Sequence, residues 1–169
     1  MLGSDKKSSV KKSSDKKSSD ELKVLVRNKK ARHEYFVERT LEAGMELRGS
    51  EVKSLRDAQA TMSDAYATVK NGQMYLVQLQ IAEYPFANYF QHEPKRERRL
   101  LLHKAEIDEL GSAVQTEGYT LLPLEIYIKK GRIKVLLGLC KGKQLHDKRQ
   151  TQRERESNRE IAREMTRRR

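Results

Sequence analysis

The chain has 169 residues, of which 36% are charged, and its formal net charge at pH 7 is +12. The length suits one small domain with appendages, and the high charge indicates that part of the chain does not pack into a core. The single cysteine, Cys140, excludes an internal disulfide, and the spacing of Cys and His excludes a zinc finger. Because no apolar run is long enough to span a bilayer, and none follows the first basic residues, we expect a cytoplasmic protein without membrane contact.

The positive charge is concentrated at the two ends of the chain. Residues 1–30 carry ten Lys and Arg against four Asp and Glu, and residues 141–169 carry eleven against five. Residues 31–140 are balanced, with fifteen of each sign. Clustered Lys and Arg release condensed counterions when they meet phosphate, so this pattern favours a polyanionic partner. Basic arms that only aid solubility are the alternative reading.

The N-terminal segment is a low-complexity repeat. Residues 5–19 read DKKSS, VKKSS, DKKSS. Such a sequence buries too little apolar surface to offset its chain entropy, so we predict a disordered extension over residues 1–23.

The first elements of the body are predicted from local composition. HEYFVERTL (33–41) is rich in aromatic and β-branched residues and predicts a strand that ends at Gly44. GSEVKSLRDA (49–58) predicts a short helix with Ser50 as N-cap and Glu51 in the first turn, where we expect a solvated acid.

Two hairpins and a helix follow. Asn71-Gly72 supplies the positive-φ residues of a tight turn between strands at 66–70 and 73–81. The helical spacing of Ile107, Leu110 and Val114 predicts a helix that Gly118 caps. The second hairpin, 124–139, turns at Gly131.

Alternation assigns the side chains of this second hairpin to two faces. One face is predicted to point inward and holds Leu124, Ile126, Ile128, Ile133, Val135, Leu137 and Leu139. The other is predicted to point outward and holds Glu125, Tyr127 and Lys129. About five or six antiparallel strands in residues 24–140 predict a mainly β fold, a small oligonucleotide-binding (OB)-like antiparallel barrel with two or three short helices.

The search for catalytic chemistry yields no constellation. The four histidines lack metal-ligand spacing, no phosphate-binding loop follows a strand, and Cys140 has no sequence context for a nucleophile. We therefore predict a non-enzyme without cofactor or metal, in which Cys140 is a small apolar residue at the end of a strand.

RNA binding fits the sequence better, because basic clusters lie beside aromatic residues that can stack on bases. The clusters are Asn28–His33, then Lys95, Arg96, Arg98 and Arg99, and finally Lys129, Lys130, Arg132 and Lys134. The aromatic candidates are Tyr35, Phe36, Tyr66 and Tyr75.

The C-terminal tail, residues 141–169, has almost no apolar residues. On a helix, Arg155, Arg159, Arg163 and Arg167 would form one stripe beside a stripe of Glu156, Glu160 and Glu164. Without an apolar face the helix is marginal in solution, so we predict a tail that is unfolded alone and helical against phosphate. A permanently disordered tail is the alternative.

Four segments together resemble the SmpB family of tmRNA-binding proteins. They are NKKARHEYFVERTLEAG (28–44), GSEVKSLRDA (49–58), LLLHKAEIDEL (100–110) and GLCKGKQLHDKR (138–149). The combination of EVKSLR with KGK-x-LHDKR is the most specific part of the resemblance. Two positions depart from the family pattern: Ala87 stands where Gly is frequent, and Gln144 where Lys is common.

The resemblance implies a non-enzymatic adaptor of trans-translation, the rescue of ribosomes stalled on messages without a usable stop codon. Such a protein clasps the tRNA-like domain of tmRNA through its barrel and is expected to be a monomer when free. Its tail enters the decoding centre and the mRNA channel of the ribosome. A general ribosome-associated or initiation-type RNA-binding protein is the alternative function.

The resemblance also implies two groups of site residues. Contact with tmRNA, or support of that contact, is carried onto Asn28, Lys29, Arg32, His33, Glu42, Lys53, Leu101 and Lys134. Contact with the ribosomal decoding centre is carried onto Gly142, Lys143, His146, Asp147, Lys148 and Arg149. A carboxylate repels phosphate, so Glu42 is expected to accept hydrogen bonds from a base or sugar or to orient a basic neighbour. Leu101 is expected either to pack beneath the RNA-facing surface or to fill the core, and the core is the favoured alternative.

Overall fold

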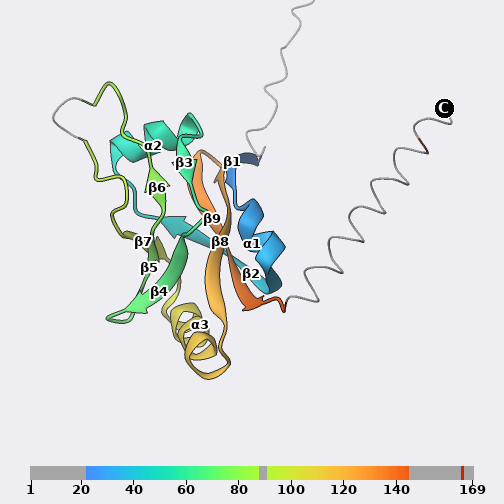
Figure 1. The fold of residues 1–169 in the computed structure, drawn as a ribbon. Helices are drawn as coiled ribbons and strands as arrows, with labels where there is room; N and C mark the ends of the chain where they lie inside the picture. The colour runs from blue at the N-terminus through green and yellow to red at the C-terminus, as the bar shows by residue number, and fades with distance from the viewer. Residues whose placement is uncertain (1–21, 88–90, 145–164, 166–169) are drawn as a thin grey trace, which may run out of the picture.

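The computed structural model describes residues 22–87, 91–144 and 165, and in these residues the protein is mainly β with three helices (Figure 1). The helices are α1 (Lys29–Glu34), α2 (Gly49–Arg56) and α3 (Lys104–Thr116). The strands are β1 (Lys23–Arg27), β2 (Tyr35–Met45), β3 (Ala60–Thr61), β4 (Tyr66–Lys70), β5 (Gln73–Val77), β6 (Gln80–Ile81), β7 (Arg98–Leu101), β8 (Thr120–Lys129) and β9 (Arg132–Gly142).

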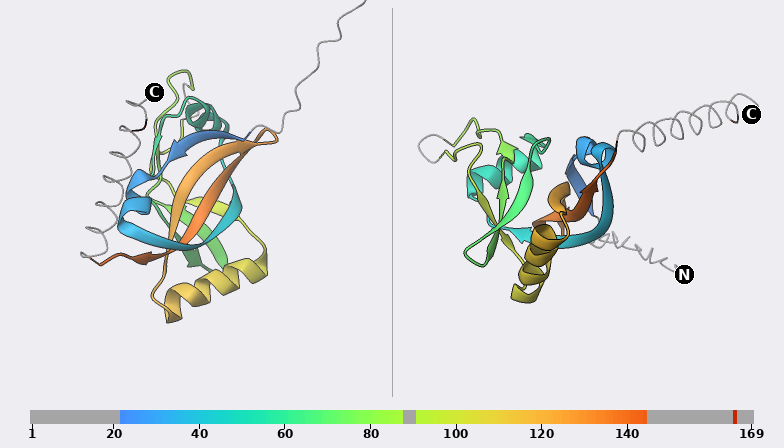
Figure 2. Two further views of the ribbon diagram at one scale, coloured as in Figure 1. Left: turned by 90° about the vertical axis from the view of Figure 1, so that its right-hand side faces the viewer. Right: turned by 60° about the horizontal axis from the view of Figure 1, so that its bottom comes forward.

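Hydrogen bonding links the long strands into one antiparallel sheet. Its order is β1-β8-β4-β5-β7-β2-β9, and β8 pairs in addition with β9. The extra pairing means that β8, β4, β5, β7, β2 and β9 follow one another in a closed circuit of neighbours. Strands β3 and β6 form a separate two-stranded sheet. Figure 2 shows the strong curvature of the sheet, with α3 lying across one end.

The segment before β2 differs from the prediction. Residues 29–34 form a helix, so His33 lies in α1 and not in a strand. Asn28 caps this helix because its side-chain oxygen accepts a hydrogen bond from the Ala31 amide at 3.0 Å. Strand β2 then continues through Gly44 to Met45, and the prediction that Gly44 ends it is wrong. Pairing of Gly44 with both Leu101 and Lys134 holds this part of β2 in the sheet.

Both predicted hairpins are confirmed. Asn71 and Gly72 have positive φ between β4 and β5, and Lys130 and Gly131 have positive φ between β8 and β9. Strand β5 ends at Val77, earlier than predicted, because the next residue also turns through positive φ and the following strand, β6, pairs with β3. Helix α3 is confirmed, and Gly118, with φ of 67°, follows its C-cap.

The faces of the second hairpin are predicted correctly for β9 and only in part for β8. Val135 and Leu137 lie in the main hydrophobic core with Ile126. A register shift between Pro123 and Glu125 places Leu124 in a smaller cluster under α1, formed with Ala31, Leu122 and Cys140. Tyr127, expected outside, is only 3% exposed. The bulge accounts for the place of Leu124, because simple alternation fails where one strand carries an extra residue. Tyr127 keeps the predicted face, opposite Lys134 of β9, and is buried there beside Glu42.

Cys140 lies where the sequence analysis placed it. It belongs to the last strand, is fully buried, and packs in the smaller cluster. Burial raises the pKa of its thiol to about 11. A protonated, inaccessible thiol is a packing group rather than a nucleophile.

Helix α2 is confirmed, but its capping is not as predicted. The helix starts at Gly49 after the N-cap Arg48, whereas Ser50 is buried and its hydroxyl lies 2.9 Å from His92 Nδ1. Glu51 accepts a hydrogen bond from the Arg48 amide at 2.6 Å. Far from being solvated, the Glu51 side chain is completely buried.

An ion network around Glu51 joins α2 to β7. Arg98 Nε lies 2.9 Å from one carboxylate oxygen, and Arg96 Nη2 lies 2.5 Å from the other. Burial alone would raise the pKa of Glu51, but hydrogen bonds from Arg96 and Arg48 hold that pKa below its usual value. Arg98 also donates to the carbonyl oxygens of Leu79 and Pro94.

The remaining predictions of chain organisation concern the two arms. Residues 1–21 and nearly all of the tail beyond Gln144 lie outside the described residues, so the predicted disorder of one and the induced helicity of the other stay predictions. Among the residues that the structure describes, no helix is long and apolar enough to cross a membrane.

Candidate nucleic-acid interface

A cluster of charged and polar side chains surrounds Glu42 on β2. Its carboxylate accepts hydrogen bonds from Tyr127 Oη at 2.6 Å and Lys129 Nζ at 2.8 Å, both on β8. Lys134 Nζ of β9 lies 3.4 Å from the second oxygen. The three neighbouring strands place these groups side by side, because β9 pairs with both β2 and β8. The carboxylate therefore orients two lysines rather than facing phosphate itself.

The electrostatics of this cluster follow from the same contacts. The hydrogen bonds from Lys129 and Tyr127 lower the pKa of Glu42 to about 2. Burial, together with the bond to Glu42, raises the pKa of Tyr127. Glu42 is therefore fully ionised at neutral pH. The Lys134 side chain is 28% exposed, and its ion pair with Glu42 fixes the position of the ammonium group. Sequence reasoning named Glu42 and Lys134 but not Tyr127, although alternation had placed that ring on the same outward face as Lys129.

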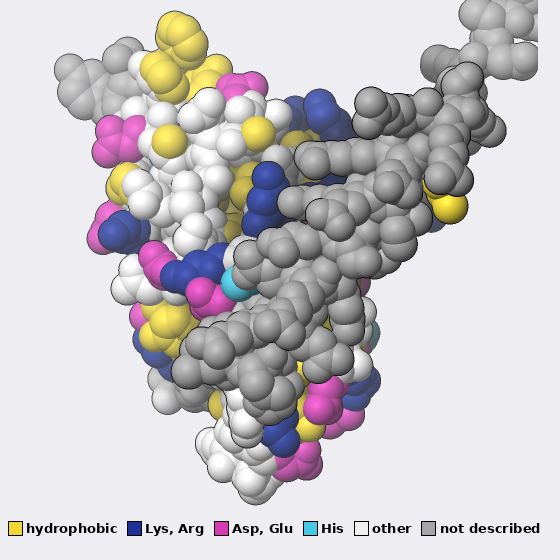
Figure 3. Space-filling view, turned by 45° about the vertical axis from the view of Figure 1, so that its right-hand side comes forward, with side chains coloured by type: hydrophobic (Ala, Val, Ile, Leu, Met, Phe, Trp, Pro, Cys, Tyr) yellow, Lys and Arg dark blue, Asp and Glu magenta, His cyan; other side chains and the backbone are white. Residues whose placement is uncertain are grey.

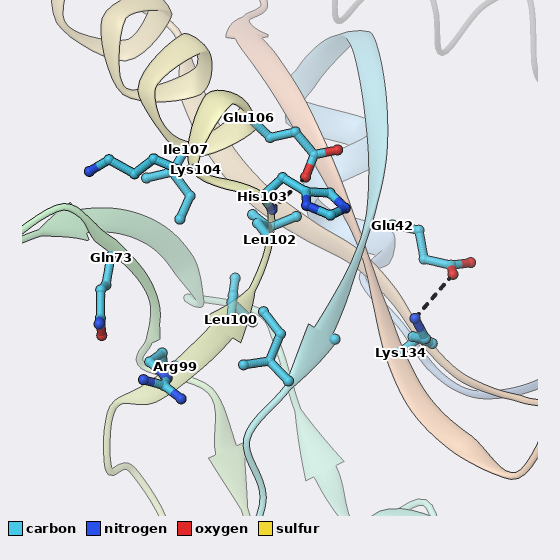
Figure 4. A pocket seen from close by; sticks show the side chains of 12 residues that line it. Glu42, Gln73, Arg99, Leu100, Leu102, His103, Lys104, Glu106, Ile107 and Lys134 are labelled. Carbon is cyan, nitrogen blue, oxygen red and sulfur yellow. Dashed lines mark hydrogen bonds and ion pairs between the residues drawn. The ribbon is translucent and has the colours of Figure 1, made fainter.

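A groove of about 640 Å³ opens beside this cluster and brings Leu101 to it. Figure 4 shows Glu42 and Lys134 on one wall of the groove and His103 with the start of α3 facing them. Leu101 is 52% exposed, whereas Leu100 is 2% exposed. Alternation along β7 explains the difference, since adjacent residues point to opposite faces. The expectation that Leu101 fills the core is wrong, and its side chain is available at the groove.

Helix α1 and its N-cap hold a second group of residues predicted to contact tmRNA, of which one is buried and three are exposed. Asn28 is 4% exposed, and its amide nitrogen donates to the carbonyl oxygens of Met62 and Pro123. Its side-chain oxygen caps α1 and its side-chain nitrogen bonds to the body, so both polar atoms of the side chain are engaged in holding the helix in place. Lys29, Arg32 and His33 are exposed. Arg32 Nη2 lies 2.8 Å from Glu125, which steadies the guanidinium without removing it from solvent.

The start of the tail is attached to the same helix. Gly142 pairs with Tyr35, which extends β9 to the beginning of β2. Lys143 then donates its backbone amide to Glu34 O at 3.0 Å, and its Nζ lies 4.8 Å from the centre of the Phe36 ring. His146, Asp147, Lys148 and Arg149, the other residues expected at the decoding centre, lie outside the described residues.

The structure divides the second basic cluster of the sequence into buried and exposed residues. Arg98, expected to be part of an RNA-binding surface, is fully buried against Glu51, and Arg96 is partly buried beside it. These arginines are therefore structural, and only Lys95 and Arg99 of that cluster are exposed. Lys53, predicted from the resemblance, is exposed on α2, with its Nζ 5.0 Å from the centre of the Tyr84 ring.

The surface of the body mixes both signs of charge. Figure 3 shows Lys and Arg side chains lying beside Asp and Glu on the part of this face that residues drawn in grey do not cover. This agrees with the balanced composition of residues 31–140 and with the ion pairs that bind Arg32 and Lys134. The arrangement suits recognition of a shaped RNA better than attraction to any polyanion. Within the described part of the chain, no group of three or more His, Cys, Asp or Glu could hold a metal ion.

Comparison with known proteins identifies the family. The model of the SmpB protein family matches residues 25–167. An SsrA-binding protein of Halalkalibacterium halodurans is 52% identical over 143 residues, which cover 85% of this chain and 93% of the relative. SsrA-binding proteins of Clostridium botulinum and Staphylococcus aureus are 49% and 50% identical, covering 82% and 83% of this chain and 89% and 92% of theirs.

A solved structure described as "tmRNA-SmpB: a journey to the center of the bacterial ribosome" is 44% identical, with a TM-score of 0.61. The likeness covers 71% of this chain and 85% of that one. The family match, which spans the body and most of the tail, agrees with the resemblance seen in the sequence, and the chain belongs to the SmpB protein family.

Proposed function

We propose that this protein is a non-enzymatic adaptor that binds the tRNA-like domain of tmRNA and delivers it to stalled ribosomes for trans-translation. The observation that carries this proposal is the similarity, over more than four-fifths of the chain, to relatives named for binding SsrA, the tmRNA. The solved relative described with tmRNA and the bacterial ribosome supports both partners. Trans-translation takes place on cytoplasmic ribosomes, so the proposed location is the cytoplasm.

We infer further that the body is an OB-like barrel. The support is the circuit of six antiparallel strands, in which the pairing of β8 with β9 gives each strand two neighbours within the circuit, while β1 pairs with β8 from outside it. Helix α3 lies across one end of this circuit, and its buried residues Ile107 and Leu110 belong to the main core. The proposed domain limits are an N-terminal extension over residues 1–23, the RNA-binding body over 24–140 and the ribosome-directed tail over 141–169.

The proposed tmRNA surface combines the Glu42 cluster with the exposed side of α1. Lys134, Leu101, Lys29, Arg32 and His33 are the groups proposed to contact RNA, with Lys53 on α2. Glu42 acts by orienting Lys129 and Lys134, and Asn28 acts by fixing α1. Lysine and arginine contacts to phosphate position the RNA, and the apolar Leu101 provides a contact that depends on shape.

A competition assay tests the proposal. Labelled tRNA-like domain of tmRNA is bound at near-physiological salt, and excess bulk tRNA or duplex RNA is added. We expect the labelled RNA to be retained selectively. Equal displacement by all competitors would mean that charge alone drives binding, and a general ribosome-associated function would then replace the proposal.

A truncation separates the two ends of the molecule. The cut belongs after Gln144, because β9 runs to Gly142 and Lys143 contacts α1. We expect the shortened protein to bind the tRNA-like domain nearly as tightly as the full chain and to lose tagging activity on stalled ribosomes. The double variant Arg32→Ala/Lys134→Ala of the full chain is the matched comparison and should lose RNA affinity instead.

A further inference from the structure

A loop beside α2 places two aromatic rings next to Lys53, and the proposed interface does not include either ring. Phe86 is 83% exposed, and its ring meets that of Tyr84 edge to face, with centroids 5.6 Å apart. Lys53 Nζ lies over Tyr84 at 5.0 Å from the ring centre. The three side chains form an aromatic–cation platform, defined here as Lys53, Tyr84 and Phe86. Figures 1 and 2 show that the described part of this loop, residues 82–87, extends away from the sheet next to α2.

Hydrogen bonds to residues on either side of the loop hold the backbone of Tyr84 and the position of His92. The Gln91 side chain accepts from the Tyr84 amide at 3.2 Å and donates to the Tyr84 carbonyl oxygen at 2.6 Å. These two hydrogen bonds join Tyr84 to Gln91 across the loop. His92, which is buried, lies 2.9 Å from Ser50 Oγ and 3.2 Å from Ile81 O, and so attaches the loop to α2 and β6.

The chemistry of the platform indicates its partner. An exposed aromatic ring held by a second ring offers a face on which an unpaired base can stack, and stacking tolerates any base. The neighbouring ammonium group of Lys53 can meet the phosphate of the same nucleotide. Lys53 and Arg56 make the last turn of α2 basic, which matches a negatively charged backbone. Figure 3 shows hydrophobic side chains standing out at the end of the molecule where this loop lies.

We propose that the Lys53–Tyr84–Phe86 platform is a second RNA contact that stacks an unpaired nucleotide of the tRNA-like domain of tmRNA. The inference rests on the proposed function and extends it from Lys53 on α2 to Tyr84 and Phe86 in the loop beside that helix. Phe86 supplies the stacking face, Tyr84 holds that ring at its edge, and Lys53 takes the phosphate.

The test measures affinity for the tRNA-like domain with the full-length protein and four variants at position 86. Phe86→Ala and Phe86→Leu should weaken binding by about 5- to 160-fold, the range found for removing one base stack. Phe86→Tyr and Phe86→Trp should keep wild-type affinity, because each retains an aromatic face. Leu22→Ala, which also truncates an exposed apolar side chain, is the matched control and should have no effect.

Salt dependence separates stacking from charge. Lys53→Ala should lower the slope of log affinity against log salt by about one, as expected for one lost phosphate contact, whereas Phe86→Ala should leave the slope unchanged. Wild-type affinity in Phe86→Ala would overturn the inference, as would a loss seen only on ribosomes. Equal weakening by Ala, Leu, Tyr and Trp would also overturn it, since a stacking face would then be irrelevant. Failure of the wild-type protein to prefer the tRNA-like domain would instead refute the proposed function.

Discussion

Replacement of Glu51 should be the most damaging single change to a charged residue in the body. The side chain is completely buried and receives hydrogen bonds from Arg96, Arg98 and the Arg48 amide. Glu51→Ala leaves the buried guanidinium of Arg98 without its counter-charge. Breaking a buried ion pair in this way costs about 3–5 kcal/mol, which is a large part of the roughly 5–15 kcal/mol that stabilises a typical domain.

Urea unfolding followed by far-ultraviolet circular dichroism measures this free energy. The matched control is Glu46→Ala, which removes the partner of Arg99 in an exposed ion pair at 2.9 Å and should cost about 0–1 kcal/mol. Glu51→Gln keeps the shape of the side chain but loses the charge, so it should fall between the two. If Glu51→Ala were destabilised no more than Glu46→Ala, the network around Arg98 would not contribute as its burial implies.

Three further predictions concern particular groups. The folded-state pKa of Glu42, about 2, lies below its ordinary value of 4.5, so its contribution to stability is present above pH 4.5 and is lost as the pH falls towards 2. Acid titrations of unfolding should therefore show a smaller loss in Glu42→Gln than in the wild type over that range. Cys140, with a pKa of about 11 and no exposure, should fail to react with a thiol reagent at pH 8 until urea unfolds the protein, and rapid native labelling would contradict its burial. Leu101→Ala should weaken tmRNA binding while leaving the free energy of unfolding within about 1 kcal/mol of the wild type. Leu100→Ala, one residue away, should cost about 2–5 kcal/mol, and equal stability of the two variants would show that the faces of β7 are misassigned.

Local signals predicted those parts of the fold that local interactions determine. Asn71-Gly72 specifies its turn because both residues adopt positive φ, and the spacing of Ile107 and Leu110 predicts α3 because both side chains enter the core. Helix α1 was missed for the complementary reason. Only Ala31 of its six residues is buried, so no periodic apolar face marks it. Its stability comes from Asn28, whose partners in the loop before β4 and in β8 are far away in the sequence.

The candidate site shows the same division between local and distant information. The resemblance named Glu42, Lys134 and Leu101 as one functional group, but only the pairing of β2 with β7 and β9 explains why they meet. The aromatic platform was not foreseen at all. Lys53 and Tyr84 lie 31 positions apart, and neither the charge nor the ring is unusual by itself.

Ion pairing changes the meaning of the basic clusters. The sequence counts Arg96 and Arg98 with Lys134 as equivalent positive charges, yet the first two neutralise a buried carboxylate and the third is held at a groove. In the body, the carboxylates therefore determine which Lys and Arg side chains are exposed to a partner and how those side chains are oriented. Counting charge predicts attraction to a polyanion, whereas the placement of Glu42 and Glu51 predicts selectivity among RNAs. A protein that must choose one folded RNA from an excess of others requires this second property, because unscreened charge alone would bind them all.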